Sequence, residues 1–188
     1  MAFCHTHLHG EFSLLDGCGK AEDYAQRAVD IGQTAVALTD HGNLAGVLYH
    51  AQACEEKGVK PIIGMEAYFE PVVGQSRELK QRGHHLLLIS KNQEGFRNLM
   101  RLSSVGFTPE RFYYNPLIDW DLLARHSAGL IATSTCVSGY IPDLILQGKI
   151  EDAKEALDRF LQIFSDDFFM EIQPHDFGEQ HVVNKMIV

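Results

Sequence analysis

The sequence predicts an α/β fold in which parallel strands alternate with helices. Short apolar runs rich in β-branched residues recur along the chain, and segments with helical periodicity separate them. The chain has 188 residues, of which 45% are hydrophobic and 22% are charged. This length can bury one sizeable core, so we expect a single domain over residues 1–188.

The expected elements follow one another without a repeat or an interdomain linker. Strands are predicted at 2–8, 34–39, 61–69, 85–90, 129–133 and 167–173. Helices are predicted at 21–31, 44–57, 94–105, 119–126, 138–146, 150–164 and 179–188. The polar stretch 71–83 has no clear period and the stretch 107–116 is aromatic, so both are expected to be loops. About six strands alternating with helices indicate an incomplete barrel or an open sheet.

Composition narrows the class of protein. The sequence contains no apolar run of eighteen residues and no secretory signal, so we expect a cytoplasmic protein without a membrane partner. Its four scattered cysteines favour a reducing compartment. A formal net charge of -9 argues against a basic face that binds nucleic acid. Phosphate binding would then be local, and bound divalent cations could supply the charge.

The N-terminal HTHLH motif is the first sign of such cations. His5, His7 and His9 alternate with other residues, so in a strand they would share one face and could bind a transition metal. The alternative is a solvated edge or an expression scar. Asp16 follows in a Leu-Leu-Asp-Gly turn that could fold its carboxylate back over the same ions, although an Asp-Gly pair is often just a turn.

Other metal-ligand candidates lie at predicted strand ends or inside strands. Asp40 and His41 directly follow a strand, where ligands lie in α/β folds, although Asp40 could instead cap the next helix. Glu66 lies inside an apolar strand, where an unpaired carboxylate would be costly. His85 opens the next apolar run. Cys136 ends another apolar run, and it could be either a thiolate ligand or an inert buried cysteine.

Together these residues predict a multinuclear metal centre that hydrolyses a phosphoester. We expect Asp40, His41 and Glu66 to be catalytic. Nucleophilic Ser-His-Asp or Cys-His schemes fit less well, because Cys136 lacks a glycine elbow and the chain has no Walker-type phosphate loop.

The motifs also carry a family resemblance. HTHLHGEFSLLDG at residues 5–17 resembles the first motif of the polymerase and histidinol phosphatase (PHP) family. LTDHGNL at 38–44, GMEAY at 64–68, HHLLL at 84–88, residues 92–102, FYY at 112–114 and CVSG at 136–139 are similar to the polymerase branch, the N-terminal domain of the DNA polymerase III α subunit. The resemblance covers essentially the whole chain.

This resemblance implies a distorted (βα)7 barrel with up to three divalent ions, typically zinc, manganese or iron. Seven of the usual nine ligands are carried over, namely His7, His9, Asp16, His41, Glu66, His85 and Cys136. The family's late-strand Asp-x-His is missing. We therefore expect either an N-terminal fragment of a longer polymerase chain, truncated in its C-terminal part, or a short protein with an open centre.

Two details depart from the family expectation. Family members often have basic residues around the proline of the aromatic loop, whereas residues 115–117 are neutral here. His85 lies at the start of its predicted strand, but a site at the carboxyl ends of parallel strands needs ligands from strand ends. Either the loop at 71–83 places His85 at the metal site, or His84 is the ligand.

Three functions are compatible with these residues. The first is a 3′→5′ proofreading exonuclease acting on DNA 3′ ends, with the rest of the polymerase chain and replisome subunits as partners. The second is a structural or docking module of the polymerase, in which metal stabilises the fold without hydrolysis. The third is a stand-alone phosphatase of small phosphates, which the polymerase-like motifs make the least favoured.

Overall fold

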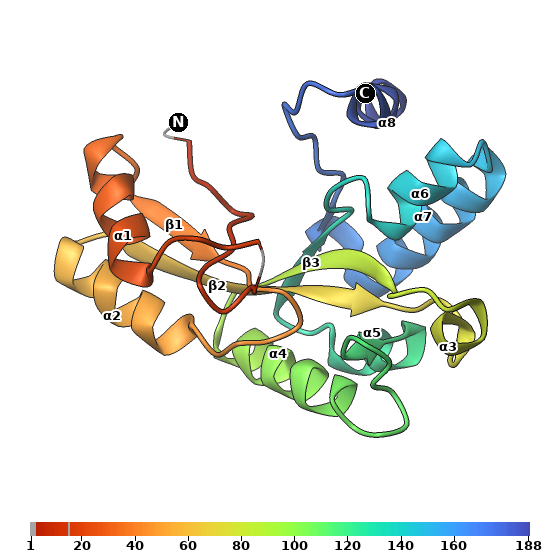
Figure 1. Cartoon of the computed structure of the whole chain (residues 1–188), viewed down its shortest axis with the longest axis horizontal. Coiled ribbons are helices and arrows are strands. Elements are labelled where there is room, and N and C mark those ends of the chain that lie inside the picture. The colour runs from red at the N-terminus through yellow and green to blue at the C-terminus, as the bar shows by residue number, and fades with distance from the viewer. Residues whose placement is uncertain (1–2, 15) are drawn as a thin grey trace.

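The computed structural model describes residues 3–14 and 16–188. Within them, six strands form one mixed sheet in the order β1-β2-β3-β5-β6, with β4 also beside β2. Strands β1, β2 and β3 cross the middle of the molecule in Figure 1. The strands are β1 (Ala35–Leu38), β2 (Lys60–Phe69), β3 (His84–Ser90), β4 (Leu117–Ile118), β5 (Leu130–Thr133) and β6 (Phe168–Phe169). The helices are α1 (Ala21–Asp30), α2 (Val47–Lys57), α3 (Gln75–Leu79), α4 (Gln93–Gly106), α5 (Trp120–His126), α6 (Tyr140–Leu146), α7 (Ile150–Phe164), η1 (Ser165–Asp167) and α8 (Gly178–Ile187).

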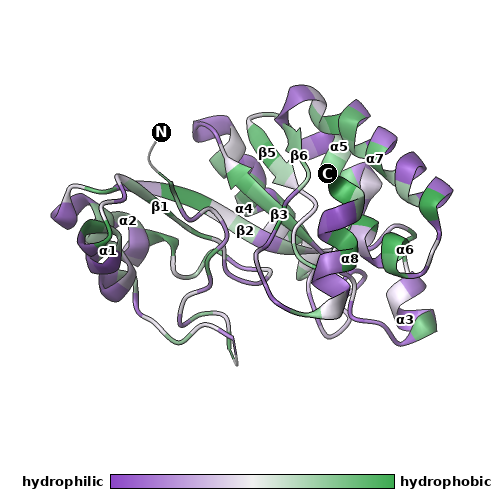
Figure 2. Cartoon of the chain, turned by 90° about the horizontal axis from the view of Figure 1, so that it is seen from above, coloured by the Kyte–Doolittle hydropathy of each residue, from purple (hydrophilic) through white to green (hydrophobic). Residues whose placement is uncertain are grey.

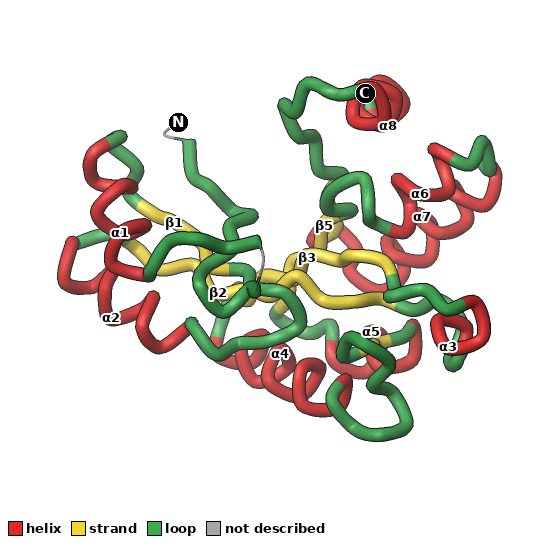
Figure 3. Tube along the Cα trace, viewed as in Figure 1, coloured by secondary structure: helices red, strands yellow, loops and turns green. Residues whose placement is uncertain are grey.

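The long strand β2 connects two parts of the sheet. Its first residues pair in parallel with β1, from Lys60 opposite Ala35 to Ile63 opposite Leu38. From Gly64 onward it pairs with β3, and β4 lies along its other edge near Phe69. In Figure 3, α1 and α2 accompany β1 on one side of the molecule, while α4 and α5 lie below β2 and β3. The strand therefore belongs to both halves of the fold. The N-terminal half contains α1, α2 and β1, and the C-terminal half contains the strands and helices from β3 onward.

The prediction of an all-parallel arrangement was wrong for β3. This strand runs antiparallel to both β2 and β5, whereas the pairs β1–β2, β2–β4 and β5–β6 are parallel. A parallel connection needs a crossover, usually a full helix packed across the sheet. The connection between β2 and β3 contains only the five-residue α3, so the chain turns back alongside β2.

Two predicted strands are shorter or less regular than expected. Residues 3–8 are not assigned to a strand, and residue 2 lies outside the described residues. The segment nevertheless follows β1, because Ala37 N donates to His5 O at 2.9 Å and Thr39 N donates to Leu8 O at 2.8 Å. The late strand predicted at 167–173 is reduced to Phe168–Phe169.

The buried hydrophobic residues form two clusters. The larger cluster contains Phe69, Trp120, Phe160 and Phe168 among many leucines and isoleucines. The smaller cluster lies between α1, α2 and β1 and consists mainly of alanines with Val36, Cys54 and Val59. In Figure 2 the strands of the sheet are mostly hydrophobic, whereas α6 and α7 alternate between hydrophilic and hydrophobic residues, as amphipathic helices do.

In the described part of the chain, no helix combines the length and hydrophobicity needed to cross a bilayer.

Candidate metal centre

A cavity of about 400 Å³ lies where the two halves of the fold meet. Its histidines come from the N-terminal segment, the turn after β1, strand β3 and the segment before α8, while β2 and the turn after β5 add an acid and a thiol. The lining residues are His7, Leu8, His9, Asp16, His41, Glu66, His85, Cys136, Gln173 and His175. The structure thus brings together all seven residues that the sequence suggested as metal ligands.

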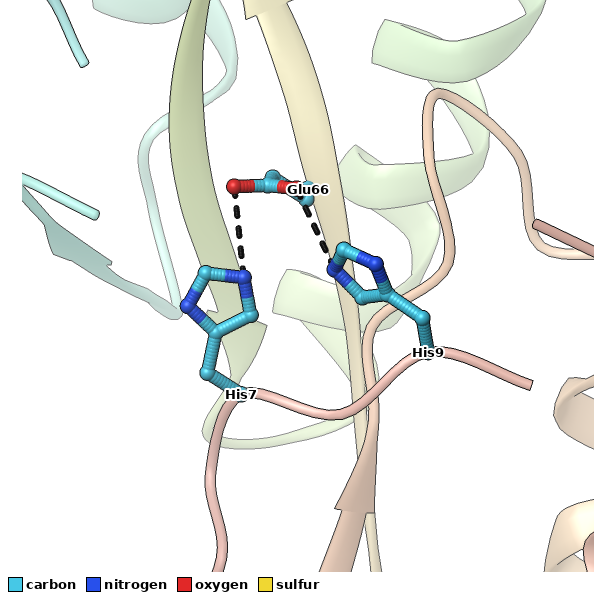
Figure 4. A group of neighbouring side chains, drawn as sticks. All are labelled: His7, His9 and Glu66. Carbon is cyan, nitrogen blue, oxygen red and sulfur yellow. Dashed lines mark ion pairs between the residues drawn. The ribbon is translucent and has the colours of Figure 1, made fainter. Parts of the chain in front are cut away.

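The carboxylate of Glu66 is the centre of this cluster. Its side chain is only 1% exposed. Oε1 lies 3.2 Å from His7 Nε2, and Oε2 lies 3.1 Å from His9 Nε2 (Figure 4). His41 Nδ1 and His85 Nδ1 each lie 3.0 Å from the same carboxylate. Four imidazoles from three segments therefore converge on one buried acid.

Several of these contacts do not have the geometry of hydrogen bonds. Among the described residues, His9 Nε2, His41 Nδ1 and Glu66 Oε2 are buried side-chain atoms without a hydrogen-bond partner. Buried polar atoms are otherwise almost always paired, so atoms that face one another without sharing a proton fit a shared cation. Two ligands of one tetrahedral zinc ion lie about 3.3 Å apart, close to the separations observed here. The donor set therefore fits divalent metal.

The possible ligand triads overlap. One comprises His7, His9 and Glu66; a second comprises His9, Asp16 and His41; a third comprises His41, Glu66 and His85. In each triad the ligand atoms lie within 4.8 Å of one another. Because His9, His41 and Glu66 each occur twice, ions bound here would be close neighbours in a multinuclear centre.

Asp16 completes the side of the cluster that faces solvent. Its Oδ2 accepts from His41 Nε2 at 2.8 Å and also contacts His9 Nδ1. The turn that carries it is held by Gly17 N, which donates to Ser13 O at 2.9 Å. A Cβ at Gly17 would lie 1.8 Å from Gly10 O, so the loop can close on itself only with glycine there.

Asp40 is buried and holds the loop that carries these ligands. Its Oδ1 accepts from Gly10 N and from Ser13 Oγ, both at 2.7 Å. Ser13 Oγ in turn accepts from His41 N at 3.0 Å. Asp40 does not belong to the cavity lining described above. The structure therefore places it behind the ligands, although the sequence suggested a catalytic role.

The antiparallel direction of β3 explains how His85 reaches the site. The start of an antiparallel strand lies beside the end of its neighbour, so His85 lies opposite Tyr68 and diagonal to Glu66. Neighbouring His84 points elsewhere: its ring centroid is 5.0 Å from that of Tyr140, and its Nδ1 is 3.8 Å from Asp143. Of the two histidines, His85 is the one in the cluster.

Cys136 approaches the cluster from the turn after β5. Its Sγ lies 3.6 Å from His85 Nδ1 and 4.0 Å from Glu66 Oε1. Burial opposes ionisation of the thiol, but the bond to His85 outweighs this effect and lowers the pKa of Cys136 below its usual value. A lowered pKa favours the thiolate, which is the form that binds metal. Thr135 Oγ1 also donates to Glu66 Oε1, at 2.6 Å.

Glu171 is a site residue that the sequence reasoning missed. Its Oε1 lies 2.8 Å from His7 Nδ1, and its Oε2 accepts from Thr133 Oγ1 at 2.6 Å. A carboxylate on one ring nitrogen fixes the orientation of a histidine and leaves the other nitrogen for metal. The signal was available, because Glu171 interrupts an apolar run as Glu66 does.

Two other histidines differ from the ligands. His5 was expected on the same face as His7 and His9, but this expectation was wrong: its Nδ1 lies 2.7 Å from Gln33 Nε2. The segment is not a regular strand, so strict alternation does not hold. His175 lines the cavity but is exposed, and among the described residues it belongs to no ligand triad.

The carboxylates control the protonation of the cluster. Burial disfavours a charged His7, but its bonds to Glu171 and Glu66 outweigh burial and raise its pKa to about 10. For His85, burial is likewise outweighed by Cys136 and Glu66, and its pKa rises to about 9. Burial would raise the pKa of Glu66, but the surrounding imidazoles hold it far below its usual range. Glu66 is therefore an anion.

The fold and site define a mixed α/β domain with a histidine–carboxylate centre for divalent cations. The chain belongs to the PHP domain family, which it matches over residues 5–175. It is 41% identical to the DNA polymerase III subunit alpha of Borreliella burgdorferi and 40% identical to that of Treponema pallidum.

These matches cover 99% and 100% of this chain but 16% of each relative, so the chain spans about a sixth of their length. A solved structure from Bifidobacterium adolescentis, provisionally described as a metal-dependent phosphoesterase, is 19% identical with a TM-score of 0.42. That match covers 98% of this chain and 63% of the other.

Proposed function

We propose that this domain is a metal-dependent phosphodiesterase that removes nucleotides from DNA 3′ ends within a larger polymerase α chain. The observation that carries the proposal is the convergence of four imidazoles on the buried Glu66 carboxylate at the bottom of a cavity. The similarity to DNA polymerase III α subunits supports DNA as the substrate, and the rest of such a chain and its replisome subunits as partners. We also propose that the domain belongs to a distorted (βα)7 barrel.

The side chains divide into ligands and residues that position them. His7, His9, Asp16, His41, Glu66, His85 and Cys136 would hold up to three divalent ions, such as zinc, manganese or iron. Bound ions would supply a hydroxide near neutral pH and positive charge against the phosphate oxygens. Glu66 and His41 are the catalytic ligands in this proposal. Asp40 and Glu171 are positioning residues, because Asp40 bonds the loop around Ser13 and Glu171 bonds the far side of His7.

The chain's own residues prepare the phosphate site in two further ways. Glu66 and Asp16 contribute negative charge that cations must neutralise before an anionic phosphate can enter. Tyr68 covers one side of the cluster, with its ring centroid 5.6 Å from that of His41 and 5.4 Å from that of His85. The ring therefore shields these two ligands from water on that side.

A docking or structural module without hydrolysis is the second candidate. The formal net charge of -9 favours it, because an acidic domain gains little non-specific affinity for DNA. In that case the metal would tie the two halves of the fold together, and its removal would change stability alone.

A comparison of Glu66→Gln with Glu70→Gln separates the two candidates. Both carboxylates are buried on or next to β2, but Glu70 accepts from Ser76 N, away from the cavity. The chain is loaded with manganese or zinc and given DNA with a mismatched 3′ end. We expect Glu66→Gln to lower the release of nucleotide by at least ~100-fold, whereas Glu70→Gln keeps it.

If the metal-loaded wild-type chain released no nucleotide, the exonuclease proposal would be overturned. A loss of melting temperature in Glu66→Gln with no loss of rate would support the docking module instead. Release of phosphate from histidinol phosphate, but not of nucleotide from DNA, would indicate a phosphatase of small substrates.

A further inference from the structure

The positive charge of the chain is concentrated in one region. Residues 71–118 contain seven of the sixteen lysines and arginines but only three of the twenty-five aspartates and glutamates. This segment is therefore basic, although the whole chain is acidic. Four of the seven cations lie in α3, the connection to β3 and the aromatic loop after α4, namely Arg77, Lys80, Arg82 and Arg111. The other three lie between the end of β3 and the end of α4.

Exposed aromatic rings and arginines meet on this surface. The guanidinium of Arg82 lies 5.9 Å from the ring centroid of Tyr114, and that of Arg77 lies 5.8 Å from the ring centroid of Tyr113. Tyr114 is 67% exposed. It has a positive φ of 58°, which a bulky residue adopts only when its surroundings enforce it.

The surroundings of Tyr114 do enforce this conformation. Asn115 Nδ2 donates to Arg82 O at 2.9 Å, and Tyr113 N donates to Asn115 O at 3.1 Å. Arg77 Nη2 donates to Phe112 O at 3.0 Å. These bonds fasten the aromatic loop to the connection before β3, so the outward ring of Tyr114 is held in place and is not a mobile loop tip.

Two of the cations on this surface are free to bind an anion. Arg111 is neutralised by Asp119, whose Oδ2 lies 2.6 Å from its Nη1, and Arg77 is used to hold the loop. Arg82 and Lys80 are exposed, and within the described residues neither forms an ion pair. They supply the charge that residues 115–117 lack.

The surface adjoins the metal centre. A Cβ at Gly42, the residue after His41, would lie 2.6 Å from the ring of Pro116 and 3.2 Å from that of Tyr68. Gly83, the residue after Arg82, also packs against Tyr68, because a Cβ there would lie 3.5 Å from Tyr68 Cβ. Arg82 and Tyr114 are thus joined to the ligand His41 by directly packed neighbours.

We propose that Arg82, Lys80 and Tyr114 bind the single-stranded 3′ tail of a DNA substrate next to the metal centre. This inference rests on the proposed function and names the residues that would hold the strand. Aromatic rings stack on unpaired bases, and arginine binds both bases and phosphates, so such a surface selects single strands over duplex. The concentration of charge in residues 71–118 removes the objection that an acidic chain cannot bind DNA.

Binding of fluorescein-labelled (dT)12 by the full chain tests this surface without depending on hydrolysis. Anisotropy is measured in chelator at low salt for the wild type, Arg82→Gln, Tyr114→Asn and Lys57→Gln. Asparagine tolerates a positive φ better than most residues. Lys57, exposed at the end of α2 in the other half of the fold, is the matched control for loss of one charge.

We expect Arg82→Gln and Tyr114→Asn each to weaken binding about 10-fold, and Lys57→Gln to bind like the wild type. Arg82→Gln should also reduce the slope of log affinity against log salt by ~0.7, the value for one phosphate contact on a single strand. Tyr114→Asn should leave that slope unchanged, because stacking releases no counterions. Arg82→Lys should restore part of the affinity.

Wild-type affinity in both variants, or equal affinity of the wild type for duplex, would overturn the proposal. Hydrolysis of bis(p-nitrophenyl) phosphate by the metal-loaded chain is followed in parallel. Its absence in the wild type counts against the proposed function, whereas selective loss of (dT)12 binding in the two variants still supports the DNA surface.

Discussion

The two halves of the molecule are held together in different ways. In the larger cluster, Trp120 and Phe160 have ring centroids 4.6 Å apart, and Phe160 stacks on Phe168 at 4.9 Å. The smaller cluster between α1, α2 and β1 is built mainly of alanines, with Val36 and Val59 as its largest aliphatic residues. Large rings bury more apolar area than methyl groups, so the C-terminal half has the greater hydrophobic stabilisation.

The metal-ligand candidates come from both halves of the molecule. His7, His9, Asp16 and His41 belong to the N-terminal half, while His85 and Cys136 belong to the C-terminal half. Glu66 lies on β2, which pairs with strands of both. We infer that the aromatic core stabilises the C-terminal half by itself, whereas the N-terminal half depends on metal ligands that both halves supply.

The largest effect is expected from removing a ring of the aromatic core. Phe160→Ala should lower the free energy of unfolding by about 3–5 kcal/mol, because it leaves a cavity among Phe69, Trp120 and Phe168. Val36→Ala in the small cluster should cost about 2 kcal/mol. Urea unfolding measures both, and a larger loss in Val36→Ala would reverse the comparison.

Metal should protect the N-terminal half selectively. At a free concentration of 100 times its Kd, a bound ion stabilises the folded chain by about 2.7 kcal/mol. For amides that exchange through local opening and not through global unfolding, the added protection should be largest at Ala37 and Thr39. The amides of these two residues bond to the ligand-bearing segment. Hydrogen exchange with zinc or with chelator measures this effect. Equal protection in α7 would contradict it.

The pH dependence of metal binding tests whether both halves supply ligands. The pKa of His7 is raised to about 10 and that of His85 to about 9, so at pH 7 both rings carry protons that a metal must displace. Affinity should rise with pH, up to roughly 100-fold per unit near pH 7 for two protons, and level off above pH 10. Titration calorimetry in two buffers counts the protons released. Release of a single proton would mean that a protonated ligand comes from only one half.

The smallest effect concerns His50, which ties α2 to β1. Its ring is buried, and Nε2 lies 3.0 Å from Val36 O. Burial lowers its pKa below the usual 6.5, so the unfolded chain takes up a proton first as the pH falls. The contribution to stability is complete above pH 6.5 and is lost below it. His50→Gln, which can still donate to Val36 O, should flatten the loss of stability between pH 7 and 5.

Most helices could be predicted from the sequence, because helical periodicity is a local signal. The seven ligand candidates were found from polar residues in apolar runs together with the family resemblance. The direction of β3 could not, since it depends on how the connection through α3 returns to the sheet. That direction also places His85 in the site. The separate position of His5 was missed for a similar reason: alternation predicts a shared face only in a regular strand.

Arg82 and Tyr114 illustrate a further limit. The sequence showed neutral residues around the proline of the aromatic loop, where family members often have basic ones. The nearby charge comes from a different segment, which bonds to the loop through Asn115. Charge that is supplied across space from another loop cannot be recognised from the loop itself.

The position of Glu66 between two separately packed clusters also has a kinetic consequence. Its partners range from His7 to Cys136 along the chain, so the complete set of contacts requires long-range loop closure and is expected to form after each cluster has collapsed. Interactions absent from the folding transition state act on the unfolding rate. A bound ion should therefore slow unfolding and leave the rate of folding almost unchanged. It would give the folded domain kinetic stability without taking part in the folding nucleus.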